Sequence, residues 1–137
     1  MIAVDTSVWV AALRAATSSE ARVLKTLLDA DEVLLPLPVR IELLCGASKS
    51  DRPGLRWALS ALPIAYPTEE TWQTVDDWIE RASSSGQRFA FGDLLIGAIA
   101  EENEAVIWSL DRDFERMDRS GLLHVYDRHA IEGFKDQ

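Results

Sequence analysis

Four acidic residues lie where an apolar segment ends or where a helix is expected to begin. Asp5 follows "IAV", Glu42 interrupts the apolar run "VRIELL", Asp93 opens "DLLIGAIA", and Asp111 follows "VIWSL". Asp113 adds a fifth acid two residues further on. Each acid alone has a structural explanation, because Asp caps helices readily and acids are common in exposed turns. Together they indicate a site only if the fold brings them to one place.

Metal chemistry is what a cluster of such acids would support. Two carboxylates ~4 Å apart at an effective dielectric of about 20 repel each other by about 4 kcal/mol. Such a pair either shares a proton or is neutralised by a cation. Because the ligands are oxygens and no Cys/His set has the spacing of a zinc site, the expected cation is Mg²⁺ or Mn²⁺.

The elements that position these acids alternate between short apolar strands and helices. Strands are predicted at residues 2–4, 33–38, 63–67, 105–110 and 122–127. Helices are predicted from Ser7, over 18–32, 39–48, 55–62 and 68–87, and over 93–103 and 111–117. This alternation indicates an α/β fold in which helices flank a short parallel sheet. Ligands of such sheets bind beyond the carboxyl ends of the strands, where Asp5 and Asp111 are expected.

Two local predictions concern which side chains the helices bury. In the segment 68–87, Thr68 is the expected N-cap. The spacing of apolar residues there predicts a buried face formed by Trp72, Val75, Ile79 and Ala82. The single cysteine, Cys45, lies in the apolar context "IELLCGA" and is expected to be a buried small hydrophobic residue.

Length and composition indicate a single domain over residues 1–137. No apolar run approaches the ~20 residues that span a bilayer, and no basic leader precedes the first apolar residues, so a cytoplasmic protein without a membrane partner is expected. The net charge of −9 disfavours nonspecific attraction to nucleic acid. Any function on nucleic acid therefore needs local basic residues or metal ions, and Arg112 and Arg116 beside Asp111 are candidate basic residues.

Four motifs in this order resemble those of the PIN domain ribonucleases, and among them the VapC toxins of bacterial toxin and antitoxin pairs. They are "VDTSVWV", "PLPVRIELLCG", "FGDLLIGAIA" and "VIWSLDRDF", which together span residues 4–114. The resemblance implies a single Rossmann-like PIN domain with an acidic pocket that binds Mg²⁺ or Mn²⁺. It also implies a metal-dependent endoribonuclease that acts as a toxin and is restrained by a VapB-type antitoxin.

Position by position, the resemblance assigns roles to the residues of the motifs. The acidic quartet corresponds to Asp5, Glu42, Asp93 and Asp111, with Asp113 as an additional ligand. Supporting hydroxyls correspond to Ser109 and to Ser7 or Thr6. The substrate would be RNA, either tRNA or another structured RNA. The Leu- and Trp-rich helices between residues 55 and 80 are expected to form a homodimer face or a groove for the antitoxin.

Two other functions compete with this interpretation. One is a metal-dependent phosphatase, although an aspartyl-phosphate phosphatase usually has two acids at alternate positions after its first strand and "VDTSV" has one. The other is a noncatalytic α/β module whose acids cap helices and whose apolar helices bind a partner protein. Absence of metal binding would favour the second alternative.

Overall fold

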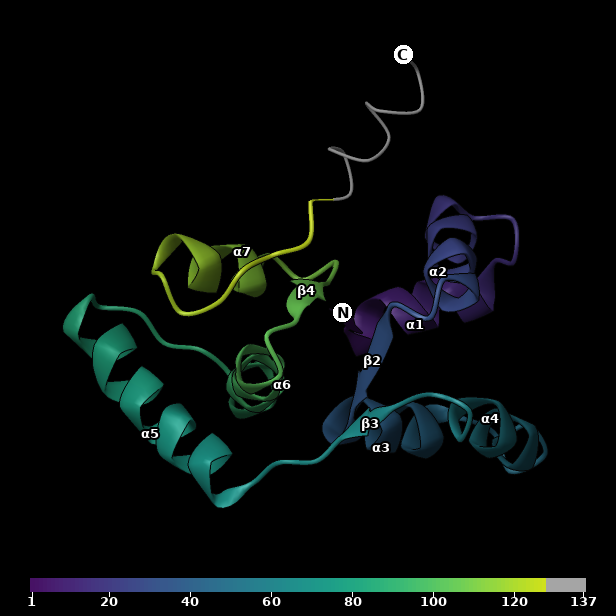
Figure 1. Cartoon of the computed structure of the whole chain (residues 1–137), viewed down its shortest axis with the longest axis horizontal. Helices are drawn as coiled ribbons and strands as arrows, with labels where there is room; N and C mark the ends of the chain where they lie inside the picture. The colour runs from purple at the N-terminus through teal and green to yellow at the C-terminus, as the bar shows by residue number, and fades with distance from the viewer. Residues whose placement is uncertain (128–137) are drawn as a thin grey trace, which may run out of the picture.

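The computed structural model describes residues 1–127 (Figure 1). Residues 128–137, which complete the single domain expected over 1–137, lie outside the described residues. Strands and helices alternate as the sequence predicts. In chain order the elements are β1 (Ile2–Val4), α1 (Thr6–Arg14), α2 (Ser19–Asp29), β2 (Val33–Pro36), α3 (Leu37–Gly46), α4 (Arg52–Leu59), β3 (Ile64–Ala65), α5 (Glu69–Ser84), α6 (Phe91–Glu102), β4 (Val106–Trp108) and α7 (Arg112–Arg119).

The four strands form one open parallel sheet in the order β3-β2-β1-β4. In the middle of β1, Ala3 is paired with Leu34 on one side and with Ile107 on the other. The chain therefore proceeds outward from β1 through β2 to β3 and then returns to place β4 on the opposite side of β1. Ligands of such sheets bind where the strand order reverses, here beyond the carboxyl ends of β1 and β4. The predicted α/β class with a short parallel sheet is confirmed.

Helices cover both faces of the sheet, with α5 and α6 on one side and α1 and α2 on the other (Figure 1). The middle of helix α6 is fully buried, since every residue from Leu94 to Ala100 is buried. A helix whose middle turns are apolar all round belongs in the interior. Neighbouring side chains lie so close to the middle of α6 that Gly97 has no room for a side chain. A Cβ at Gly97 would lie 2.8 Å from Leu123 Cδ2. No helix within residues 1–127 is long and apolar enough to cross a membrane.

Helix α3 begins earlier than predicted and presents a different face. The strand expected over 33–38 ends at Pro36, and Pro38 lies in the first turn of the helix, where its missing N–H is not needed. The buried residues of α3 are Val39, Leu43 and Leu44. Cys45 was expected to be buried but is exposed, because it follows Leu44 on the side that turns away from the core.

Helix α5 is capped as predicted but buries a neighbouring stripe of residues. The Thr68 side chain accepts a hydrogen bond from the backbone N–H of Thr71, and the Thr71 hydroxyl accepts one in return from the Thr68 N–H. The predicted buried face is wrong at Trp72 and Ile79, which are 46% and 47% exposed. The buried residues are Thr71, Val75, Trp78 and Ala82. Both stripes have helical spacing, and only packing against α6 selects one.

The last predicted strand, over residues 122–127, does not form. A single parallel bridge joins Ile107 to Val125. The apolar residues Leu122 and Leu123 are nevertheless buried, so the segment contributes to the core without extending the sheet.

Candidate metal centre

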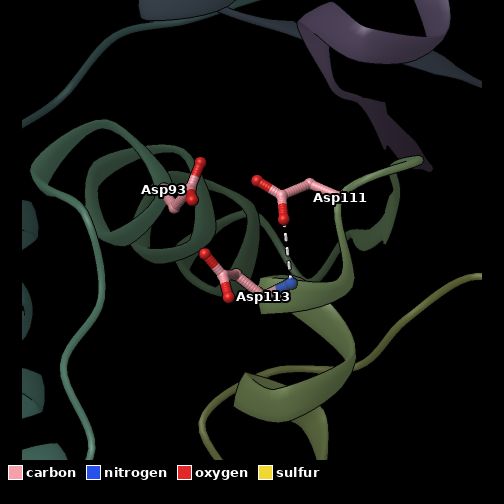
Figure 2. A group of neighbouring side chains, drawn as sticks. All are labelled: Asp93, Asp111 and Asp113. Atoms are coloured by element: carbon pink, nitrogen blue, oxygen red, sulfur yellow. Dashed lines mark hydrogen bonds between the residues drawn. The ribbon is translucent and has the colours of Figure 1, made fainter.

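Three aspartates converge at the carboxyl edge of the sheet (Figure 2). Asp93, Asp111 and Asp113 each offer a carboxylate oxygen, and these oxygens all lie within 4.8 Å of one another. Asp93 is the third residue of α6, whose N-cap is Ala90, so capping does not explain it. Asp111 is the N-cap of α7 and accepts a hydrogen bond of 2.9 Å from the Asp113 N–H. Two different helices therefore supply the cluster.

Asp5 lies beside this cluster and is held by two serine hydroxyls. It directly follows β1, is only 6% exposed, and makes no side-chain cap to α1. Instead, Ser7 Oγ and Ser109 Oγ both donate to its Oδ2 at 2.8 Å. The same hydroxyls accept the backbone N–H groups of Leu110 and Asp111, at 3.0 and 2.9 Å. This network joins the ends of β1 and β4.

Glu42 reaches the edge of the cluster from α3. Its side chain is exposed, and Thr6 Oγ1 donates a 2.6 Å hydrogen bond to its Oε2. Its other oxygen, Oε1, would lie 3.8 Å from a Cβ built at Gly92. Glu42 is therefore next to the first turn of α6, which carries Asp93, but it is not one of the three closely grouped acids.

Partial burial, together with the neighbouring acids, raises the pKa of Asp93 from 3.8 to about 7. Partial burial is the largest cause, followed by the negative charges of Asp111, Asp5 and Asp113 and a hydrogen bond with Asp111. The four aspartates thus behave as one electrostatic cluster. Because all of their donors are carboxylate oxygens, the cluster suits a hard cation such as Mg²⁺ or Mn²⁺.

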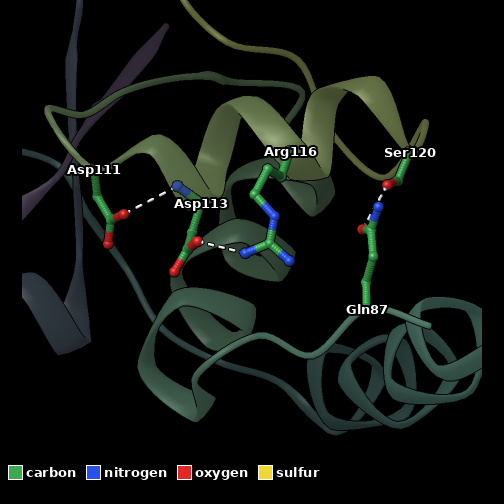
Figure 3. Close-up of polar contacts among 5 residues, drawn as sticks. All are labelled: Gln87, Asp111, Asp113, Arg116 and Ser120. Carbon is green, nitrogen blue, oxygen red and sulfur yellow. Dashed lines mark hydrogen bonds and ion pairs between the residues drawn. The ribbon is translucent and has the colours of Figure 1, made fainter. Parts of the chain in front are cut away.

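The two arginines proposed to bind RNA have different surroundings. Arg116 Nη1 donates to Asp113 Oδ1 at 2.7 Å (Figure 3). The guanidinium carbon of Arg116 lies 4.8 Å from the centre of the Phe89 ring. Arg112 is exposed and forms no ion pair within residues 1–127. Arg112 is therefore available to a ligand, whereas Arg116 is already bound to the acid cluster.

Phe89 is the residue of this site that the sequence did not indicate. It is 8% exposed and lies in the segment between α5 and α6. An apolar residue in such a segment predicts only a core position, and no local pattern shows that its ring lies under an arginine 27 residues later in the chain. The contact between Phe89 and Arg116 is a tertiary contact, formed only when the chain folds.

The chain matches one known protein family and resembles several solved structures. The family model described as PIN domain matches residues 2–120. No curated protein matches the chain. The fold is similar to VapBC2 from Rickettsia felis bound to a DNA fragment from its promoter, with 20% identity, a TM-score of 0.75 and coverage of 92% of this chain and 98% of that one.

Two further solved structures share the fold. FitAcB from Neisseria gonorrhoeae is 19% identical with a TM-score of 0.72, and the match covers 93% of this chain and 97% of that one. VapC20 from Mycobacterium tuberculosis, described as a Sarcin-Ricin loop cleaving toxin, is 21% identical with a TM-score of 0.60, covering 85% and 94%. At such low identities these likenesses show a common fold.

Proposed function

The chain belongs to the PIN domain family, and from that premise we propose that it is a metal-dependent endoribonuclease that hydrolyses RNA phosphodiester bonds. The observation that carries the proposal is the group of carboxylates from Asp93, Asp111 and Asp113 at the point where the strand order reverses. Three acids within 4.8 Å are costly without a counter-charge, and a divalent cation is the counter-charge that their chemistry suits.

Asp93, Asp111, Asp113 and Asp5 are the residues that would hold Mg²⁺ or Mn²⁺. When bound there, the ion would stabilise negative charge on the phosphate oxygens and lower the pKa of a bound water. The serine hydroxyls on Asp5 Oδ2 keep its carboxylate in one orientation. Glu42, which is exposed at the edge and accepts a hydrogen bond from Thr6, is the acid to which we assign the acceptance of a proton from water.

The proposal about binding partners is supported by the solved structures that this fold resembles. The solved neighbours include VapBC and FitAB complexes, and one neighbour is a toxin that cleaves the Sarcin-Ricin loop. We therefore propose that the chain is the cytoplasmic toxin of a VapBC-type pair, with a VapB-type antitoxin, a homodimeric state and a structured RNA such as tRNA as substrate. Exposed Arg112, one residue after Asp111, would contact the RNA backbone.

A phosphatase on this sheet is less well supported. The second acid that an aspartyl-phosphate mechanism needs would stand two residues after Asp5, and that position is Ser7. The Ser7 hydroxyl is engaged with Asp5 Oδ2 and with the Leu110 N–H. Ser7 therefore supports Asp5 and does not supply a second carboxylate.

Cleavage of labelled structured RNA, including bulk tRNA, tests the proposal when the wild type is compared with Asp93→Asn in Mn²⁺ and in EDTA. We expect wild-type cleavage to stop in EDTA. Asp93→Asn should lower the rate at least hundredfold, because metal stabilisation of the transition state is worth several kcal/mol.

The matched control is Asp51→Asn, which removes the same charge at an exposed position before α4, away from α7 (Figure 1). Its cleavage rate should equal that of the wild type. Undiminished cleavage in EDTA, or by the Asp93→Asn variant, would refute the site. Absence of Mn²⁺ binding by the wild type would favour the noncatalytic binding module.

A further inference from the structure

The two halves of the acid cluster come from helices that a separate set of contacts holds together. Asp93 belongs to α6 and Asp113 to α7. The segment that leads into α6, residues 85–90, contacts α7 at two points. Ser120 Oγ donates a 2.9 Å hydrogen bond to Gln87 Oε1 just beyond the end of α7 (Figure 3). One turn earlier, the Arg116 guanidinium lies over the Phe89 ring.

Arg116 connects the second of these contacts to the acids. Its Nη1 donates to Asp113 Oδ1 at 2.7 Å (Figure 3). Its guanidinium carbon lies over the Phe89 ring, 4.8 Å from the ring centre. Phe89 is buried, so its ring is a fixed support. Arg116 and Asp113 are about one-third exposed, which makes the ion pair alone a weak constraint. The ring contact removes much of the freedom that an exposed arginine would otherwise have.

We propose that Gln87, Phe89, Arg116 and Ser120 form a clamp that positions Asp113 opposite Asp93 and thereby raises the affinity of the acid cluster for a divalent cation. This inference rests on the proposed metal site. It assigns Arg116 as a positioning residue that acts through Asp113, in place of the RNA contact expected from the sequence.

The physical need for such a clamp comes from repulsion within the cluster. Like charges on α6 and α7 favour separation of the two helices when no cation is bound. A contact between the segment before α6 and α7 opposes this separation. The carboxylates then already have the spacing that the cation requires, and less binding free energy is lost in rearranging them. Residues that orient metal ligands in this way commonly change metal affinity when they are replaced.

Calorimetric titration of Mn²⁺ into the full chain tests the clamp without RNA. Ser120→Ala removes one hydroxyl with no change of charge, and we expect about 2- to 10-fold weaker Mn²⁺ binding, the equivalent of one hydrogen bond. Ser120→Thr keeps the hydroxyl and should restore wild-type affinity. Thermal unfolding of each variant in EDTA confirms that the fold is retained.

Arg116→Lys is the second test, because it keeps the positive charge but loses the planar group that both stacks and donates. We expect about 10-fold weaker Mn²⁺ binding. If wild type and both Ser120→Ala and Arg116→Lys bind Mn²⁺ equally, the clamp is refuted and the metal site stands. If Ser120→Thr is as weak as Ser120→Ala, the hydroxyl is not the cause and the clamp is again refuted. If the wild type binds no Mn²⁺, the clamp and the proposed function both fail.

Discussion

Replacing Asp93 by Asn should stabilise the metal-free protein at neutral pH. The folded protein holds the Asp93 proton up to about pH 7, whereas the unfolded chain loses it near pH 3.8. A carboxyl group whose pKa is raised by folding lowers stability as the pH increases through the interval between these two values. Removing the charge removes that loss, so the gain from Asp93→Asn should be small below about pH 4, increase up to pH 7 and then level off.

The magnitude follows from the same pKa. A rise from 3.8 to about 7 corresponds to about 4 kcal/mol at 1.36 kcal/mol per unit. Asp93 is only partly buried, so screening by solvent should reduce this figure to about 2 kcal/mol. For a chain of this length such a gain raises Tm by about 5–10 °C. The Asn side chain has nearly the shape of Asp and can still donate to Asp111.

Thermal unfolding followed by circular dichroism in EDTA, between pH 4 and pH 8, measures this gain. Asp51→Asn is the control and should change Tm little at any pH, since Asp51 is exposed. Mn²⁺ should then raise the Tm of the wild type and leave that of Asp93→Asn nearly unchanged, because ligands stabilise only the state they bind. An Asp93→Asn variant no more stable than the wild type at pH 8 would refute the picture of a crowded acid cluster.

Two further predictions concern the pH dependence of the site and the packing beneath it. With the pKa of Asp93 near 7, the ionised fraction of this carboxyl group increases from about one-tenth at pH 6 to about nine-tenths at pH 8. Because the ionised form is the metal ligand, Mn²⁺ should bind about 10-fold more weakly at pH 6 than at pH 8. Calorimetry in two buffers of different ionisation enthalpy should also detect release of about one proton at pH 6, and affinity independent of pH would contradict this. Gly97→Ala should lower the free energy of unfolding by about 1–3 kcal/mol, because its Cβ would meet Leu123 at 2.8 Å and Trp78 at 3.2 Å. Urea denaturation measures that loss against Gly46→Ala, where no atom lies within 4 Å of the new methyl group, and equal stability of the two variants would show that α6 can shift.

The amino-acid sequence alone determined the order of the elements and where the acids fall within it. Short apolar runs separated by helical periodicity predict a parallel sheet, and the same rule predicts that Asp5 and Asp111 lie near strand ends. The cap at Thr68 was equally predictable, because it depends on residues within one turn. These features are local, and a local pattern is what a sequence displays directly.

Tertiary structure decided which of several equivalent local patterns is used. On α5 the stripe containing Trp78 is buried and the one containing Trp72 is exposed, because only the first meets the core. Residues 122–127 have the composition of a strand but make a single bridge to β4. In both cases packing against distant elements decides which local pattern is used.

The candidate site shows the same division. The sequence indicates which acids are present, but the hydroxyl of Ser109 reaches Asp5 across 104 residues of chain. Likewise Arg116, expected to face RNA, is held by Asp113 and by Phe89 from a segment that no local pattern connects to it. Carboxylate spacing, the raised pKa of Asp93 and the partner of each arginine are properties of side chains brought together by folding. They depend on distances that residue order does not contain.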